Sequence, residues 1–166
     1  MKKTLLSIAC CLLTLFIFTT KTPSQAEAAL QAPSSQVVSD YIETLEGGSY
    51  FRVTVLEDVS PSFSRSTQTK SGSKYVTFYD ADDNALWTFT VYGTFEYTPG
   101  ANAACISSSY SVNIYDDSWE NTLATSSTNG NQAVGDATFI KKVLFITTHK
   151  ENVRLVLSCN AYGTLS

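Results

Sequence analysis

Histidine, methionine and cysteine are scarce in this chain. Its 166 residues include one His, one Met and four Cys. Two of those cysteines, Cys10 and Cys11, lie within an N-terminal apolar run. The common zinc sites use four Cys, His or carboxylate ligands or three plus a water, so a zinc site of the usual kinds is nearly excluded. We therefore expect a protein without a cofactor.

Charged residues are also few, at 16% of the chain, and acidic residues outnumber basic ones to give a net charge of −4. The sequence contains neither a glycine-rich phosphate loop nor a basic stripe. An acidic domain of this kind binds nucleic acid poorly and is repelled by anionic lipid. We expect no nucleic-acid partner, and no membrane partner once the leader described next has been cleaved.

The N-terminus has the three parts of a secretory signal. It begins Met1-Lys2-Lys3, continues with an uncharged, leucine-rich run from Thr4 to Thr20, and ends with the small residues of Ala26-Glu27-Ala28. This pattern predicts a signal peptide at 1–28 that is cleaved on export, which makes the protein secreted or extracellular. The alternative is an uncleaved anchor, although the apolar run is slightly short for a membrane span.

Export leaves Cys105 and Cys159 as the only cysteines of the mature chain. In an oxidising compartment a disulfide between them is the default expectation. Free buried thiols are the alternative. A catalytic thiol is disfavoured, because neither cysteine has a neighbouring histidine or a Cys-x-x-Cys partner.

The mature chain begins with a mixed, polar segment at 29–48, which we interpret as flexible, with one short helix as an option. The helix is suggested by the spacing of Val37, Val38, Tyr41, Ile42 and Leu45. From residue 49 onward the apolar residues alternate as in strands, so the domain is placed at 49–166.

The clearest strand is 85–98, which forms a predicted hairpin with 74–79 around the polar turn Asp80–Asn84. Gly93 lies on the apolar face of this strand and predicts a bulge or a close backbone approach. In the next strand, 103–115, Cys105 is out of phase with the apolar residues. A bulge near Ser107–Ser109 would turn it toward the core. The apolar face of 85–98 contains Trp87, Phe89, Val91, Phe95 and Tyr97.

The last third of the chain is predicted as a loop at 125–131, a long strand at 133–148 and a turn at His149–Asn152. Val143–Ile146 is continuously apolar, as in a central strand covered on both faces. Six or seven strands at short spacing indicate an all-β protein. We predict a single small antiparallel β-sandwich, immunoglobulin-like or jelly-roll-like, with a small barrel as the alternative.

Several short motifs occur along the mature chain. They are Ser71-Gly72-Ser73-Lys74, Tyr79, Leu86-Trp87, Val91-x-Gly93-x-Phe95-x-Tyr97, Ala103-Ala104-Cys105, Ser118-Trp119, Leu157-x-Cys159 and the ending Gly163-x-Leu165-Ser166. Together they resemble a family of small, uncharacterised secreted proteins of Gram-positive, clostridia-like bacteria over about 95 residues, and the paired cysteines and the ending are the most specific of them. The turn before Cys105 is longer here than in that family. The resemblance implies a secreted, disulfide-linked β domain and no particular activity.

The densest group of oxygen ligands is Asp80, Asp82 and Asn84, a weak calcium candidate. The spacing matches the start of a calcium loop. However, Ala85 stands where that loop requires glycine, and Val91 replaces the closing glutamate. A polar hairpin turn is the favoured interpretation.

No catalytic arrangement is visible. His149 is the only candidate general base, and it falls in a predicted exposed turn without a nucleophile motif. We therefore expect no enzyme activity. Candidate ligand contacts are Tyr92, Tyr115 and Trp119; for Trp119, packing in the core is the competing interpretation.

These features favour a secreted, non-catalytic binding module that contacts a cell-wall or extracellular polymer, or a protein. A bacteriocin-like or toxin-like effector is the alternative. A hydrolase whose carboxylates come together across strands is a more remote one. A flat face rich in tyrosine and threonine would favour binding, and an exposed apolar patch would favour insertion into a membrane or partner. An acidic cleft with two carboxylates would favour the hydrolase.

Overall fold

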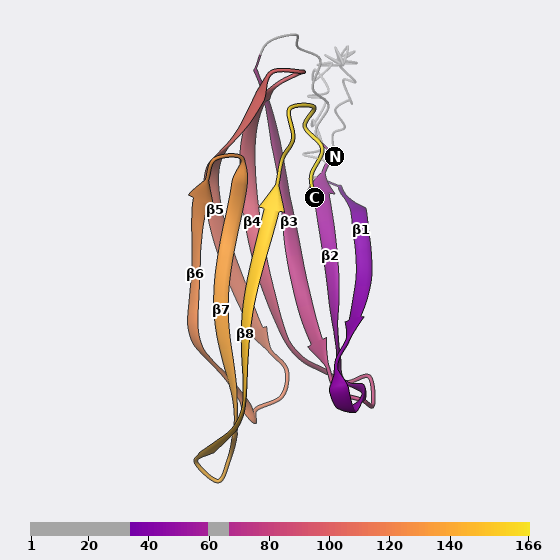
Figure 1. Cartoon of the computed structure of the whole chain (residues 1–166), viewed down its shortest axis with the longest axis vertical. Coiled ribbons are helices and arrows are strands. Elements are labelled where there is room, and N and C mark those ends of the chain that lie inside the picture. Colours follow the sequence, from indigo (N-terminus) through magenta and orange to yellow (C-terminus); the bar gives the residue numbers. More distant parts are fainter. Residues whose placement is uncertain (1–33, 60–66) are drawn as a thin grey trace, which may run out of the picture. The chain divides into compact units, whose positions relative to one another are not determined.

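The computed structural model describes residues 34–59 and 67–166 (Figure 1). The predicted signal peptide at 1–28 lies outside the described residues. The described residues all belong to one compact unit, Gln31–Ser166. No helix long and apolar enough to cross a membrane occurs among them.

The described residues form eight strands and one short 3-10 turn. They are β1 (Ser35–Thr44), η1 (Glu46–Gly48), β2 (Tyr50–Asp58), β3 (Gln68–Tyr79), β4 (Ala85–Thr98), β5 (Asn102–Ile114), β6 (Trp119–Asn129), β7 (Gln132–Val143) and β8 (Ile146–Ser158). The all-β prediction is confirmed, but the strand number of six or seven is too low.

Two antiparallel sheets make up the fold. Sheet A has the order β1-β2-β3-β4-β5 and sheet B has the order β6-β7-β8. Every hydrogen-bonded neighbour is also the next strand along the chain, so both sheets are simple meanders. Immunoglobulin and jelly-roll folds contain Greek-key connections. The expectation of an immunoglobulin-like or jelly-roll-like order is therefore wrong, although the arrangement of two sheets is β-sandwich-like.

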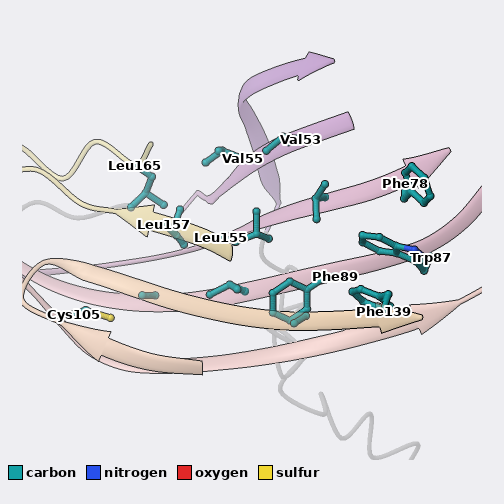
Figure 2. Packing of buried hydrophobic residues seen from close by; sticks show 14 of the residues in the cluster. Val53, Val55, Phe78, Trp87, Phe89, Cys105, Phe139, Leu155, Leu157 and Leu165 are labelled. Carbon is teal, nitrogen blue, oxygen red and sulfur yellow. The ribbon is translucent and has the colours of Figure 1, made fainter. Parts of the chain in front are cut away.

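One apolar core joins the two sheets, and β4 contributes most to it. Trp87, Phe89, Val91 and Phe95 of this strand are fully buried, as the alternation predicted. The Trp87 ring stacks on Phe139 of β7, with centroids 3.8 Å apart and planes 5° from parallel. Figure 2 shows this pair between the sheets, with Leu155 and Leu157 of β8 further along the same core.

Close packing at the core explains two of the sequence signals. A Cβ atom on Gly93 would lie 2.7 Å from the Phe95 ring, which confirms the predicted close approach. The β4–β5 register shifts where Thr94 pairs with Ser107 and Phe95 pairs with Cys105. Ile106 is therefore the extra residue of a bulge, next to the predicted position, and Cys105 turns inward.

The segment predicted as flexible or helical instead contains β1. Strand β1 pairs with β2 along its whole length, with one irregularity between Val37 and Ser39. The apolar spacing at 37–45 suits a helix, but a helix there would leave the edge of β2 unpaired. Pairing with β2 supplies hydrogen bonds that outweigh a weak local preference.

Two predictions in the last third of the chain are also wrong. Residues 125–129, predicted as a loop, continue β6, and residues 149–152, predicted as a turn, lie inside β8. The turn falls at Leu144-Phe145 instead, between Val143 and Ile146, which pair with each other. The run Val143–Ile146 is thus the exposed end of the β7–β8 hairpin rather than part of a buried central strand.

Candidate functional site

The face of sheet A that points away from the core is lined by hydroxyl groups. Cross-strand rows such as Thr54–Tyr75–Thr90–Ser111 and Arg52–Thr77–Thr88–Asn113 run across four strands. We call this surface the outer face and define it by Tyr50, Arg52, Thr54, Tyr75, Thr77, Tyr79, Thr88, Thr90, Tyr92 and Ser111. Along β2, β3 and β4 the residues of the outer face alternate with core residues, because successive side chains of a strand point to opposite faces of the sheet.

Hydrogen bonds between neighbouring strands order the outer face. The hydroxyls of Thr77 and Thr88 lie 2.8 Å apart, and those of Tyr92 and Ser111 lie 3.2 Å apart. Thr77 and Thr88 are buried between larger neighbours, whereas Tyr92 is 44% exposed. The tyrosines therefore provide much of the accessible aromatic surface of this face.

Charged and aromatic groups meet at the β1–β2 side of the outer face. The Arg52 guanidinium donates to the Asp40 carboxylate at 2.6 Å, and the Thr54 hydroxyl donates to the same carboxylate at 2.9 Å. Hydrogen bonds from Arg52 and then Thr54 lower the pKa of Asp40. Tyr50 stacks on Tyr79 with ring centroids 4.8 Å apart. This corner is a preorganised surface of one ion pair and two stacked rings.

The three predicted ligand contacts do not come together. Tyr92 lies on the outer face, and Tyr115, 56% exposed, follows the end of β5. Trp119 begins β6 and is only 5% exposed, because it packs against Phe78 and Trp87 in the core. Its ring also borders a cleft at one end of the two sheets.

That cleft has a volume of about 540 Å³ and is lined by Phe78, Leu86, Trp119, Lys141 and His149, among others. His149 Nε2 lies 2.6 Å from Glu151 Oε1, and its ring meets the edge of Trp119 at 5.7 Å. No described hydroxyl forms a hydrogen bond with His149. The cleft thus contains a histidine that is held by Glu151 beside apolar side chains. No nucleophile among the described residues is hydrogen-bonded to this histidine.

The predicted calcium ligands form the β3–β4 turn. Asp80 Oδ1 accepts hydrogen bonds from the backbone N–H groups of Asp82 and Asn84, at 3.0 and 2.9 Å. The Asn84 side chain donates to both Asp80 oxygens, and the Tyr50 hydroxyl donates to Asp83 at 2.9 Å. Among the described residues no group of three His, Cys, Asp or Glu side chains is placed to hold a metal ion. The carboxylate of Asp80 is used by the turn itself.

Cys105 and Cys159 are both buried and are not joined by a disulfide in this structure. The backbone N–H groups of both cysteines nevertheless form hydrogen bonds with consecutive residues of the β6–β7 turn. Cys105 N–H donates to Gly130 at 2.8 Å, and Cys159 N–H donates to Asn131 at 3.0 Å. Burial raises the pKa of each thiol, which disfavours a reactive thiolate.

The β7–β8 hairpin ends in four consecutive apolar residues, Val143–Ile146, which we call the apolar tip. Leu144 is 86% exposed and Phe145 is 99% exposed. Both adopt positive φ, 48° and 71°, a backbone region that bulky side chains rarely occupy. Figure 1 shows the hairpin extending away from the neighbouring strand ends of the same unit.

Sequence reasoning missed the apolar tip as a surface. The signal that could have found it is length, because the predicted strand at 133–148 exceeds the usual upper limit of about 10 residues and has room for a tight turn. Lysines precede the apolar run and threonines follow it, which suits two strands meeting at an exposed end.

No family model, curated protein or solved structure matches this chain.

Proposed function

We propose that this protein is a secreted, non-catalytic binding module with a β-sandwich fold, whose outer face binds an extended, hydroxyl-rich polymer of the cell envelope or matrix. The observation that supports this proposal most strongly is the set of tyrosine side chains on the outer face. Tyr92 is 44% exposed, and the threonines among the tyrosines are 3% to 8% exposed. A polysaccharide offers the matching chemistry of many hydroxyl groups and apolar ring faces that pack on aromatic side chains.

The shape of the outer face suits a chain better than a small molecule. Small ligands are usually enclosed in a deep pocket, whereas an extended polymer can lie along a sheet and gain many weak contacts. Tyr75, Tyr79 and Tyr92 lie on neighbouring strands, so one polymer could contact several rings at once. Hydroxyl rows with fixed partners lose little side-chain entropy on binding.

The proposal includes oxidation of Cys105 and Cys159 to one disulfide after export, by exchange with the disulfide of an extracellular oxidant that takes up the two electrons and two protons of the thiols. It is supported by the burial of both thiols and by their backbone hydrogen bonds to the adjacent residues Gly130 and Asn131. The bond would close a loop of about 55 residues, worth roughly 4 kcal/mol in the chain-entropy model. The resemblance to secreted paired-cysteine proteins agrees with this expectation.

Co-sedimentation tests the binding proposal. Protein exported with its own leader is mixed with washed Gram-positive cell walls and with insoluble polysaccharides. We expect saturable binding that falls about tenfold or more in a Tyr75→Ala/Tyr92→Ala variant, since each ring contributes on the order of 1 kcal/mol.

The matched control is Leu123→Ala, which removes an exposed side chain of β6 in sheet B. Binding that is unchanged in the tyrosine variant but lost in the control would contradict the assignment to the outer face. An unaltered circular dichroism spectrum checks that each variant is folded.

Thermal unfolding with and without reductant tests the disulfide. We expect the exported protein to melt at a clearly lower temperature after reduction, and a Cys105→Ala/Cys159→Ala variant to be insensitive to reductant. Equal melting temperatures for the oxidised and reduced wild type would refute the disulfide without bearing on the outer face.

One observation favours the alternative of a toxin-like effector. The apolar tip exposes four consecutive apolar side chains, and effectors that act on neighbouring cells must engage their surfaces.

A further inference from the structure

We propose that the apolar tip, Val143–Ile146, inserts into the interfacial region of a lipid bilayer with anionic headgroups. This inference concerns residues outside the outer face and does not depend on the proposed polymer binding. It also departs from the expectation based on net charge, because the local arrangement at the hairpin differs from the average over the chain.

The first support is the exposure of the tip. Four consecutive apolar side chains lie in solvent, and Phe145 makes almost no contact that shields it from water. Next to the tip, Lys142 N–H donates to the Ser118 carbonyl at 2.8 Å. Val143 and Ile146 pair with each other across the turn.

The second support is the backbone of the turn. Two-residue hairpin turns with positive φ at both positions strongly prefer Asn-Gly or Asp-Gly, because those residues adopt this conformation at little cost. This turn has Leu144 and Phe145 instead. Large apolar residues in this conformation are strained, and they gain no burial within the domain in return. Strain of this kind persists where a function other than folding requires the side chains.

The third support is the order of charged, polar and apolar residues along the hairpin. Lys141 and Lys142 precede the tip, while Thr147, Thr148 and Lys150 follow it. Lys150 lies about four residues, or roughly 13 Å, from Ile146 along the strand. An interfacial segment sinks roughly 5–10 Å into the boundary between headgroups and acyl chains. Insertion of the tip would therefore bring the lysines to the level of the headgroups.

Two acidic side chains near the tip have partners on the hairpin. Glu120 forms an ion pair with Lys142, and Glu151 Oε1 lies 2.6 Å from His149 Nε2. The Lys150 side chain is exposed and forms no hydrogen bond or ion pair among the described residues. It is therefore the cation best placed to meet an anionic headgroup.

A bilayer suits this surface better than a protein groove. The four side chains surround the end of a two-stranded hairpin and are 49% to 99% exposed, and Val143 also borders the cleft beside Trp119. A lipid phase contacts such a tip from all sides, whereas a groove contacts one face.

Vesicle binding of the full exported protein tests the proposal. The probes are vesicles of phosphatidylcholine alone and of phosphatidylcholine mixed with phosphatidylglycerol. We expect binding to the mixed vesicles that weakens with added salt and that falls about tenfold or more in a Leu144→Asn/Phe145→Gly variant. That variant places the preferred residues in the turn, so it is expected to fold at least as well as the wild type.

Two further variants sharpen the test. Leu123→Asn removes an exposed apolar side chain from β6 and should leave vesicle binding unchanged. Phe145→Trp places a fluorophore at the tip, and its emission should shift to shorter wavelength with mixed vesicles and be quenched by brominated lipid.

Three results would overturn the proposal. The first is equal vesicle binding by the wild type and the Leu144→Asn/Phe145→Gly variant. The second is absence of binding to either vesicle. The third is self-association of the wild type, measured by sedimentation velocity, that the same variant abolishes while vesicles have no effect, because the tip would then contact a second copy. None of these results bears on polymer binding by the outer face.

Discussion

The β3–β4 and β7–β8 hairpins are built alike in the strands and differently at the turn. In the β3–β4 hairpin, Asp83 has a positive φ of 63°, and the carboxylate of Asp80 accepts four hydrogen bonds that stabilise the turn. In the second, Leu144 and Phe145 take positive φ, and their side chains make no ring or hydrogen-bond contact among the described residues.

The comparison separates a turn that serves folding from one that does not. An aspartate such as Asp83 tolerates the left-handed region of backbone conformation. The carboxylate of Asp80 accepts hydrogen bonds from backbone N–H groups that would otherwise face solvent. Leucine and phenylalanine contribute neither property. On our proposal, the β7–β8 turn instead serves contact with a lipid surface outside the domain.

The largest loss of stability should come from removing a core contact that both hairpins share. Trp87 of β4 stacks on Phe139 of β7, so Trp87→Ala removes a contact of each hairpin. We expect a loss of about 3–5 kcal/mol in the free energy of unfolding, measured by urea titration. Trp87→Phe keeps an aromatic ring in the stack and should lose clearly less. Equal losses would show that the stack is not what joins the hairpins.

An intermediate effect should follow from breaking the polar turn. Asp80→Ala removes the acceptor of four hydrogen bonds and should lower the melting temperature by a few degrees at neutral pH, whereas Asp80→Asn keeps one acceptor oxygen and should lower it less. Hydrogen bonds from Asn84 lower the pKa of Asp80 below its usual 3.8.

The same shift predicts a pH dependence with a definite sign. A carboxyl whose pKa is lower in the folded state stabilises the fold above its unfolded value of 3.8, and this stabilisation is lost as the pH falls through the folded pKa. The wild type and Asp80→Ala should therefore approach each other in melting temperature under strongly acidic conditions. A difference that stays constant down to the lowest pH would assign the effect to packing instead.

The smallest effect should come from the ion pair at the base of the apolar hairpin. Lys142 and Glu120 are 44% and 53% exposed, so the attraction between them is screened by water. We expect Glu120→Gln to change the free energy of unfolding by less than about 0.5 kcal/mol. A loss several times larger would mean that this pair holds the hairpin in place.

The contrast between the hairpins also explains how far the sequence could predict the fold. The β3–β4 hairpin was predicted because strand alternation and turn residues agree there. At β7–β8 they disagree, since Val143–Ile146 has the composition of a buried strand and the position of a turn. A local pattern predicts burial only on the assumption that apolar residues are covered, and Val143–Ile146 is exposed.

The remaining wrong predictions depend on contacts between segments that are distant in the sequence. The apolar residues at 37–45 suit a helix until the open edge of β2 is known. The order of strands and the division into sheets of five and three depend on long-range pairing. Of the candidate contacts, Tyr92 lies on the outer face and is 44% exposed, whereas the burial of Trp119 depends on core contacts with Phe78 and Trp87 that the sequence alone does not show.

The most direct test of the central claim is the melting temperature of the Leu144→Asn/Phe145→Gly variant. If the apolar turn serves a contact outside the domain, replacing it with the preferred turn residues should raise stability by about 1 kcal/mol and the melting temperature with it. A clear fall in the melting temperature would contradict the account, because Leu144 and Phe145 would then be required by the fold itself.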